Sequence, residues 1–152
     1  MAQEFKAIGK KVERVDAFER LVGQAKYAAD VYLPGMLYAK ILRSPHPHAR
    51  ILKVDVSKAA ALPGVKAVLT AADVPKATIH KRATPPTVEM PVFAGIARYV
   101  GDEIMAVAAT DEDLAEEALE LVKVDYEVLP FVLEMEEAMK PGAPKIYPEG
   151  NV

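Results

Sequence analysis

Residues 103–128, which read EIMAVAATDEDLAEEALELVKVDYEV, decide the fold because three patterns follow one another within them. Residues 103–109 form a nearly unbroken apolar run, which is typical of a central strand covered on both faces. Residues 122–128 alternate between apolar and polar side chains, which predicts a second, half-buried strand. The segment between the two strands has helical spacing. A strand, a helix and a strand in this order predict a helix packed on a sheet.

The helical segment, residues 111–122, is the strongest helix candidate in the chain. Its apolar positions form one stripe that we expect to be buried, consisting of Leu114, Ala118, Leu121 and Val122. Thr110 is the expected N-cap and Asp113 the expected capping-box acid, because an acid three residues after the cap can bond back to it. The glutamates on the opposite face are expected to face water.

Shorter elements are predicted on the N-terminal side of this stretch. They are, in chain order, strands at 37–43 and 49–56, a helix at 57–62 with Ser57 as its N-cap, a strand at 65–70 and a single helical turn at 71–74. Residues 76–95 contain Pro85, Pro86 and Pro91 and few large aliphatic residues, so they predict a long irregular loop. The resulting fold class is α/β (α+β), with one amphipathic helix packed on a mixed sheet.

The chain divides into three parts by composition. Residues 1–30 are mixed in charge and have no sustained periodicity, which predicts an N-terminal arm that lies against a partner or frays. Residues 31–139 hold the predicted domain. Residues 140–152 are rich in proline and glycine, which predicts an extended tail that serves as a linker toward further domains.

Composition excludes several classes of function. The chain has 152 residues, of which 51% are hydrophobic and 27% charged, the balance of a globular domain. A net charge of -3 argues against a nucleic-acid-binding protein, which usually has a basic excess. The chain has no cysteine, so it cannot hold a disulfide, a cysteine-ligated Fe–S cluster or a thiolate nucleophile. No apolar run is long enough to span a membrane, and the first residues lack the apolar core of a signal peptide, so we expect a cytoplasmic location.

The segment His46-Pro47-His48 raises the question of a metal site. A mononuclear metal site needs three or four ligands, and no third ligand is evident near these two histidines, since His80 is remote in the sequence. The flanking prolines favour a tight turn, so we expect surface histidines in a turn and no metal ligands here.

Other candidate residues carry no recognisable chemistry either. The acids of residues 111–120 are expected to serve helix capping and solvation, and Ser44, Ser57 and Thr110 have no neighbouring base that would activate them as nucleophiles. Gly95 and Gly101 lack the spacing of a phosphate-binding loop, and Gly101 is expected in a bulge or turn. From the residues alone we expect no catalytic, no cofactor-binding and no metal-binding residue.

Several motifs, in order, nevertheless resemble one family. They are GQAKYAAD (23–30), LPGMLYA (33–39), LRSPHPHARI (42–51), LPGV (62–65), VLTAADVP (68–75), YVGD (99–102), AVAA (106–109) and VDYEVLP (124–130). This set is similar to the N-terminal a/b hammerhead domain of molybdenum hydroxylase large subunits. That family includes xanthine dehydrogenase, aldehyde oxidase, carbon monoxide dehydrogenase and 4-hydroxybenzoyl-CoA reductase, and residues 33–51 look most like the last type.

The resemblance implies a non-catalytic structural domain within a larger oxidoreductase. The parent enzyme would carry molybdopterin or its cytosine dinucleotide, with Fe–S clusters and, in some members, FAD in companion domains or subunits. The implied partners of this domain are the molybdenum-binding domains of the same subunit, an Fe–S subunit or domain, and in some members a flavin subunit. The resemblance places the catalytic positions outside these residues, so the 152-residue chain is expected to be inactive.

One alternative stays open at this point. A chain of this size could act alone as a small binding or regulatory α/β module without catalytic activity. Exposed apolar surface would distinguish the two, because a domain that packs on others leaves an uncovered apolar face, whereas a module that works alone does not. We expect that face at apolar residues of the arm or of the C-terminal tail, and it would make self-association of the chain plausible. These residues are Phe5, Ile8, Phe18 and Leu21 in the arm and Phe131, Val132, Met135, Ile146 and Tyr147 in the tail. The substrate of the parent enzyme is not encoded in these residues.

Overall fold

The computed structural model describes residues 9, 11–74, 78–81 and 88–151, and the chain forms two compact units, Met1–Pro34 and Gly35–Val152. The described part of the first unit contains helix α1 (Ala17–Leu21) and the 3-10 helix η1 (Ala28–Asp30). Local hydrogen bonds hold it, such as those from the backbone N–H groups of Gln24 and Ala25 to the carbonyl of Glu19. None of its described residues is buried.

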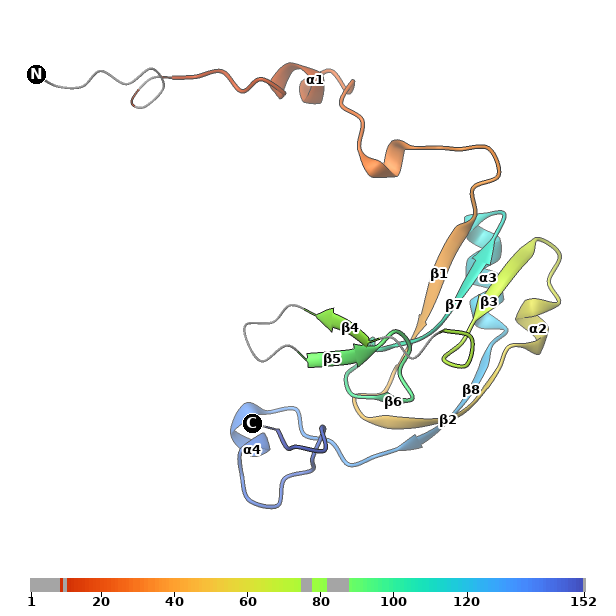
Figure 1. Ribbon diagram of the computed structural model, residues 1–152, viewed down its shortest axis with the longest axis vertical. Helices are drawn as coiled ribbons and strands as arrows, with labels where there is room; N and C mark the ends of the chain where they lie inside the picture. Colours follow the sequence, from red (N-terminus) through yellow and green to blue (C-terminus); the bar gives the residue numbers. More distant parts are fainter. Residues whose placement is uncertain (1–8, 10, 75–77, 82–87, 152) are drawn as a thin grey trace, which may run out of the picture. The chain divides into compact units, whose positions relative to one another are not determined.

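The second unit contains two three-stranded sheets and one hairpin (Figure 1). The first sheet has the order β1 (Tyr38–Arg43), β7 (Glu103–Ala109), β3 (Val65–Leu69), and the second has the order β6 (Ile96–Ala97), β2 (Ala49–Asp55), β8 (Lys123–Val128). The hairpin pairs β4 (Thr78–Lys81) with β5 (Val88–Pro91). The helices are α2 (Ser57–Ala60), α3 (Glu112–Glu120) and α4 (Met135–Ala138).

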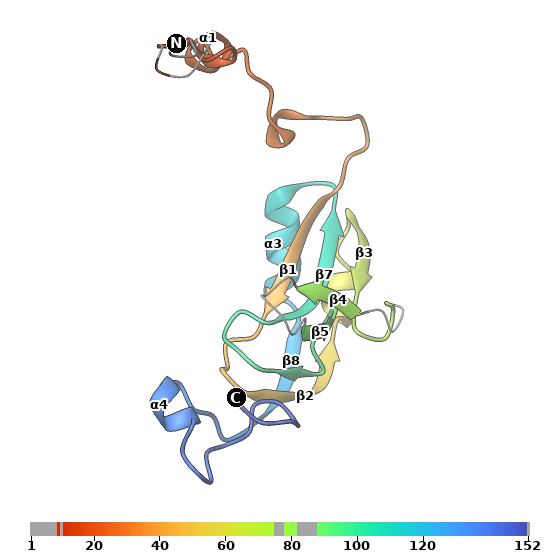
Figure 2. The same cartoon turned by 60° about the vertical axis from the view of Figure 1, so that its left-hand side comes forward.

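The core is built around the central strand β7. Ile104, Met105 and Val107 are its fully buried large side chains, and they form one cluster with Ala59 of α2 and Ala118 of α3. Helix α3 runs alongside β1 and β7, as Figure 2 shows. The expected position of residues 103–109 in the middle of a sheet is therefore confirmed.

Helix α3 is the longest helix in the described residues, as expected, and most of its predicted stripe is covered. Ala118 is fully buried, while Leu114, Leu121 and Val122 are half-buried, the last two packing against the core cluster. Ala115, which the spacing did not single out, is also fully buried.

The predicted cap of this helix was wrong by one residue. Asp111, not Thr110, is the N-cap, and its Oδ1 accepts hydrogen bonds from the N–H groups of Asp113 and Leu114. The backbone N–H of Thr110 instead donates to the carbonyl of Gly64. Because the cap lies one residue later, Asp113 does not occupy the capping-box position.

The fold class is confirmed, with a different sheet arrangement. All strand pairs among the described residues are antiparallel, and the strands form separate sheets where one mixed sheet was expected. Pro45 and Pro47 lie between β1 and β2, and since proline has no N–H to donate, the chain turns there and β2 pairs elsewhere.

Three shorter elements also differ from expectation. Residues 76–95, expected as an irregular loop, contain β4 and β5, although 76–77 and 82–87 lie outside the described residues. Ser57 is the first residue of α2 and not its cap, since Asp55 accepts its N–H and hydroxyl. Residues 71–74 form a turn instead of a helical turn, because the carboxylate of Asp73 bonds back to Thr70.

The chain after β8 folds back on itself. Helix α4 follows β8, and the remaining residues contain turns and a single bridge between Tyr147 and Gly150, with no further helix or strand up to residue 151. Hydrogen bonds made by the side chain of Asn151 close this segment into a loop, where an extended tail was expected over residues 140–152. No helix formed by the described residues is both long enough and apolar enough to cross a membrane.

Candidate functional site

The most buried polar side chains of the described residues gather where β1, β2, β7 and β8 meet. Ser44, Asp102 and His48 are only 2%, 3% and 7% exposed. The N–H of Ser44 donates to the carbonyl of Asp102 at 2.9 Å, and the N–H of Gly101 donates to the carbonyl of Ser44 at 2.8 Å. The carboxylate of Asp102 accepts the N–H of Arg98 at 3.0 Å. These bonds join the end of β1 to the start of β7.

The two histidines of the 46–48 segment make different contacts. Nδ1 of His48 lies 2.7 Å from the carbonyl oxygen of Pro130, and since a carbonyl can only accept, Nδ1 carries the proton and donates. The ring of His46 meets the ring of Tyr126 edge-on, with centroids 4.9 Å apart and an interplanar angle of 73°. The expectation of surface histidines was wrong for His48, because the contact with Pro130 draws its ring inside.

The described residues contain no cluster of three or more His, Asp or Glu side chains that could hold a metal ion. The side chain of His80 lies outside the described ones. The hydroxyl of Ser44 exchanges hydrogen bonds with the backbone of His46 and not with its ring, so the pair does not have the geometry of an activated nucleophile.

Two of the acids on α3 attach this helix to β1. Lys40 Nζ lies 2.6 Å from Glu112 Oε1 and 2.6 Å from Glu116 Oε1. These hydrogen bonds, that of Glu112 first, raise the pKa of Lys40 above its ordinary value, so the lysine stays charged. Glu112 and Glu116 therefore connect helix α3 to strand β1 through Lys40.

Gly101 lies in a turn, as expected. Its φ is 96°, in the region that favours glycine, and its carbonyl accepts the guanidinium of Arg43 at 2.7 Å. The register between β1 and β7 shifts at the neighbouring Leu42 and Arg43, which marks a bulge. Gly95 lies next to β2, and its carbonyl accepts the N–H of Ile51.

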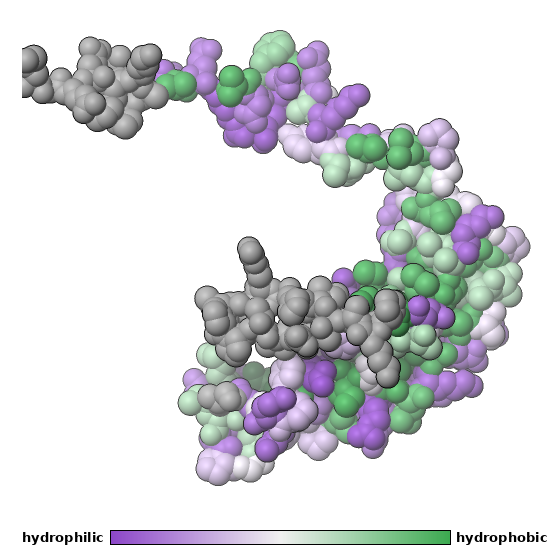
Figure 3. Space-filling view, viewed as in Figure 1, coloured by the Kyte–Doolittle hydropathy of each residue, from purple (hydrophilic) through white to green (hydrophobic). Residues whose placement is uncertain are grey.

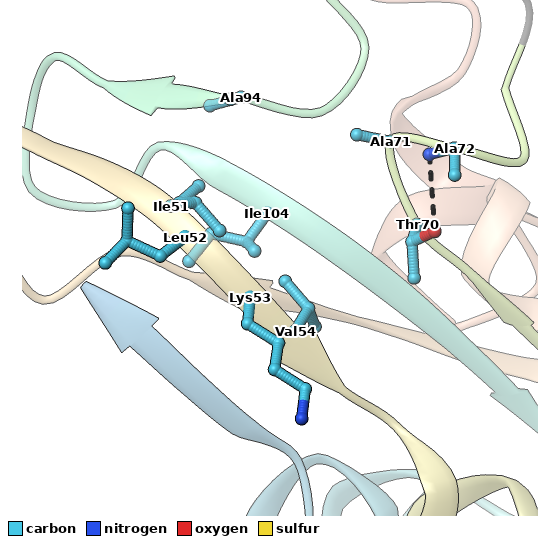
Figure 4. A pocket seen from close by; sticks show the side chains of 10 residues that line it. Ile51, Leu52, Lys53, Val54, Thr70, Ala71, Ala72, Ala94 and Ile104 are labelled. Atoms are coloured by element: carbon cyan, nitrogen blue, oxygen red, sulfur yellow. Dashed lines mark hydrogen bonds between the residues drawn. The ribbon is translucent and has the colours of Figure 1, made fainter. Parts of the chain in front are cut away.

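Two shallow hollows flank the ends of β2 and β3. The first, about 250 Å³, is shown in Figure 4. Its lining is Ile51, Leu52, Lys53, Val54, Thr70, Ala71, Ala72, Ala94, Gly95 and Ile104. The second, about 450 Å³, shares Val54 and Thr70 with the first and has Lys66 and Asp73 as its charged lining residues. The hydroxyl of Thr70 already donates to Asp73 at 2.7 Å, so neither hollow presents a free acid and base facing each other.

Besides the buried polar residues and the hollows, the described residues include many exposed apolar side chains. Of the residues expected to be poorly covered, Phe18, Leu21, Phe131 and Met135 are exposed, which confirms the expectation for them. Val132, Ile146 and Tyr147 are half-buried, and Phe5 and Ile8 lie outside the described residues. In the space-filling view, hydrophobic residues are interleaved with hydrophilic ones along the described part of the first unit (Figure 3).

The sequence did not predict the burial or exposure of four of these residues. The burial of Ser44 and Asp102 and the exposure of Leu133 and Met139 were not anticipated. No local pattern could have shown that Ser44 and Asp102 lie together, because the backbone hydrogen bond between them joins the end of β1 to the start of β7. Leu133 and Met139 flank a run of glutamates, a pattern that would have predicted a short amphipathic helix.

Comparison with known proteins gives consistent matches. A family model for the a/b hammerhead domain of aldehyde oxidase and xanthine dehydrogenase matches residues 22–130. The chain is 43% identical over 152 residues to the carbon monoxide dehydrogenase large chain of Afipia carboxidovorans, covering 94% of this chain and 18% of the relative. It is 39% identical over 155 residues to the nicotinate dehydrogenase large molybdopterin subunit of Eubacterium barkeri, covering 100% of this chain and 35% of the relative.

Solved structures agree with these relatives. The crystal structure of quinoline 2-oxidoreductase from Pseudomonas putida 86 superposes with a TM-score of 0.85 at 37% identity, covering 99% of this chain and 20% of that chain. The chain thus spans between 18% and 35% of the lengths of these three proteins.

Proposed function

The chain belongs to the aldehyde oxidase and xanthine dehydrogenase a/b hammerhead family, and from this premise we propose that it is a structural, non-catalytic domain of the large subunit of a molybdenum-dependent oxidoreductase. The observation that carries the proposal is the match to large chains over nearly the whole of this chain. The relatives are named as large chains or subunits, which supports a place among further domains and subunits.

The described residues do not fit a molybdenum cofactor. A phosphate-bearing pterin needs a cradle of backbone N–H groups or converging polar side chains, such as a glycine-rich loop at a helix start. The first hollow is small and mostly apolar, and among the described residues that line it only Lys53 is charged. In the second, Asp73 is engaged by Thr70. We therefore assign no catalytic, cofactor-binding or metal-binding residue to this domain, and no reaction step passes through it.

The partners in this proposal follow the expected domain organisation. An arm at residues 1–30, a hammerhead domain at 31–139 and a linker at 140–152 would connect this domain to the part of the large subunit that binds molybdopterin or its cytosine dinucleotide. An Fe–S domain or subunit, and a flavin subunit in some enzymes, would complete the electron path. The exposed apolar residues support a packing role over that of a module working alone.

The substrate of the parent enzyme belongs to the rest of the polypeptide. The relatives and structures compared above are named for carbon monoxide, nicotinate and quinoline, so the family does not fix one substrate. The narrower resemblance to the 4-hydroxybenzoyl-CoA reductase type stays a prediction from the sequence.

The direct test compares the 152-residue chain with the complete polypeptide that carries it, co-expressed with its partner subunits. Molybdenum is measured by elemental analysis, and dye reduction is followed with carbon monoxide, nicotinate, quinoline, aldehydes, purines and an aromatic thioester. We expect molybdenum and activity in the complete enzyme and neither in the 152-residue chain. Stoichiometric molybdenum in the short chain would contradict the non-catalytic role, and a complete enzyme free of molybdenum would contradict the proposed parent.

A further inference from the structure

The segment after β8 carries a compact group of uncovered apolar side chains. Leu133, Met135 and Met139, here called the α4 surface, are 74%, 77% and 69% exposed. Met135 and Met139 are four residues apart, at the start and the C-cap of α4, so they lie on one side of the helix. Phe131, earlier in the segment, is less exposed at 44%, whereas Val132, Ala138, Ile146 and Tyr147 are half-buried. The segment thus has a covered side and an uncovered side.

One side chain holds this segment in place. Asn151 Oδ1 accepts the N–H of Ile146 at 2.9 Å, and Asn151 Nδ2 donates to the carbonyls of Pro144 and Ala138 at 2.8 and 3.2 Å. The bond to Ala138 reaches the last residue of α4, thirteen positions back. A single amide therefore closes the loop that begins at the α4 surface.

A second side chain attaches the closed loop to the sheet region. Arg98, directly after β6, donates from Nε to the carbonyl of Ile146 at 3.2 Å. Its guanidinium also lies over the ring of Tyr147, 4.9 Å from the ring centroid. The loop is thus fastened at both Ile146 and Tyr147, so the exposure of the α4 surface does not come from a loose tail.

The α4 surface combines an ordered loop with exposed apolar side chains. Ordering a loop lowers the entropic cost of binding to it, whereas leaving large apolar side chains in water on an ordered loop is unfavourable. We propose that the α4 surface is the docking surface through which this domain packs on the remainder of the large-subunit polypeptide; this rests on the function proposed above. In the quinoline 2-oxidoreductase chain, the part that matches this chain accounts for 20%, so most of that polypeptide is available to cover such a surface.

The charged residues around the α4 surface indicate which chemistry its docking partner, the rest of the large subunit, must have. Glu134, Glu136 and Glu137 are exposed and lie between the apolar residues of the α4 surface. Lys140, directly after Met139, is exposed as well. The surface of the large subunit that docks here is therefore apolar at its centre and basic where it meets the three glutamates, since like charges would repel them.

The methionines provide the test, because oxidation by hydrogen peroxide to the sulfoxide reports whether a methionine is reached by solvent. Mass spectrometry gives the oxidation rates of Met135 and Met139, with fully buried Met105 as the protected reference. We expect both to oxidise rapidly in the 152-residue chain and to lose this reactivity, toward the rate of Met105, in the complete large subunit.

The oxidation rates distinguish the possible partners of the α4 surface, which are the rest of the large subunit and a second copy of this chain. Rapid oxidation of Met135 and Met139 in the complete subunit overturns the proposal. Protection that appears in the 152-residue chain as its concentration rises also overturns it, in favour of a second copy. Molybdenum is measured in the same samples, so protection without molybdenum contradicts the proposed enzyme and leaves the docking surface standing.

The role of Asn151 is tested in the complete subunit with Asn151→Asp. The variant keeps an acceptor for Ile146 but loses both donors and places negative charge beside the carbonyls of Pro144 and Ala138. We expect loss of protection at Met135 and Met139, with Met105 still protected as proof of folding. The control is Glu149→Gln, a neutralising change at an exposed position of the same loop, which should leave protection unchanged. Full protection in Asn151→Asp would contradict the positioning role.

Discussion

At position 64 the backbone requires a residue without a Cβ atom. Gly64 has a φ of 98°, and a Cβ there would lie 2.6 Å from Leu114 Cδ2 and 3.0 Å from Thr110 Oγ1. Its carbonyl accepts the N–H of Thr110, so the turn before β3 and the start of α3 are in direct contact. The turn signal Pro63-Gly64 is visible in the sequence, whereas the contact with α3 is not.

We therefore expect Gly64→Ala to destabilise the second unit by about 2–4 kcal/mol, from left-handed backbone strain and from displacement of Leu114. Gly101→Ala is the matched control, since Gly101 also has a positive φ but a Cβ there would meet nothing within 4 Å. It should cost about 1–2 kcal/mol. Denaturant unfolding measures both, and equal losses would contradict the close approach to α3.

Asp73 makes the turn after β3 sensitive to acid. Hydrogen bonds from the hydroxyl and then the N–H of Thr70 hold the pKa of Asp73 below its ordinary value. A lowered pKa in the folded state means that the stabilisation is present above the ordinary value, about pH 4, and is lost as the pH falls through the lowered value.

In Thr70→Val the hydroxyl donor is absent, so we expect the pKa of Asp73 to rise toward its ordinary value. Carboxyl NMR titration measures this shift. Asp73→Asn should in turn flatten the loss of stability on acidification, as followed by urea midpoints between about pH 5 and pH 2. A titration of Asp73 that is the same with and without the Thr70 hydroxyl would contradict the assignment.

At the scale of elements, the sequence of α3 predicts the position of the helix and its covered side, but not its N-cap. Its periodicity located the helix and its covered side, but two neighbouring residues, Thr110 and Asp111, are both good N-caps by type. The choice between them was made by Gly64, which takes the N–H of Thr110 and sets the point where the chain turns into the helix.

Replacing the cap, Asp111→Ala, should destabilise the second unit by about 1 kcal/mol, because the N–H groups of Asp113 and Leu114 lose their acceptor. Asp111→Asn keeps an oxygen acceptor and should lose less. Thermal unfolding followed by circular dichroism compares the two. A larger loss for asparagine than for alanine would show that Asp111 does not act as the cap.

At the scale of the whole molecule, the two units differ in how they are stabilised. The second unit has a buried core, whereas the described residues of the first unit bury no side chain and form helices of only five and three residues. Such short helices are not stable by themselves in water, so we expect the first unit to unfold more readily than the second.

We expect limited trypsin digestion to cut the 152-residue chain first at Lys11, Arg14, Arg20 or Lys26 and to leave the second unit intact. Mass spectrometry identifies the cuts, and the product should retain the thermal transition of the uncut chain, because the core cluster lies wholly within the second unit. First cuts at Lys40 or Lys123, or a product without a transition, would contradict this division.

The sequence alone determined the elements whose signal is local. The apolar run of β7, the stripe of α3, the alternation of β8 and the absence of cysteine are all readable without coordinates, because periodicity depends only on neighbours in the chain. The motifs between residues 23 and 130 likewise sufficed to predict the family.

The tertiary structure decided everything that depends on residues far apart in the chain. Lys40 meets Glu116 across 76 positions and His48 meets Pro130 across 82, and no local pattern encodes such pairs. The division into separate antiparallel sheets and the closure of the C-terminal loop by Asn151 have the same origin. Periodicity shows which side of an element is apolar, but only the packing of the elements selects which partner covers it.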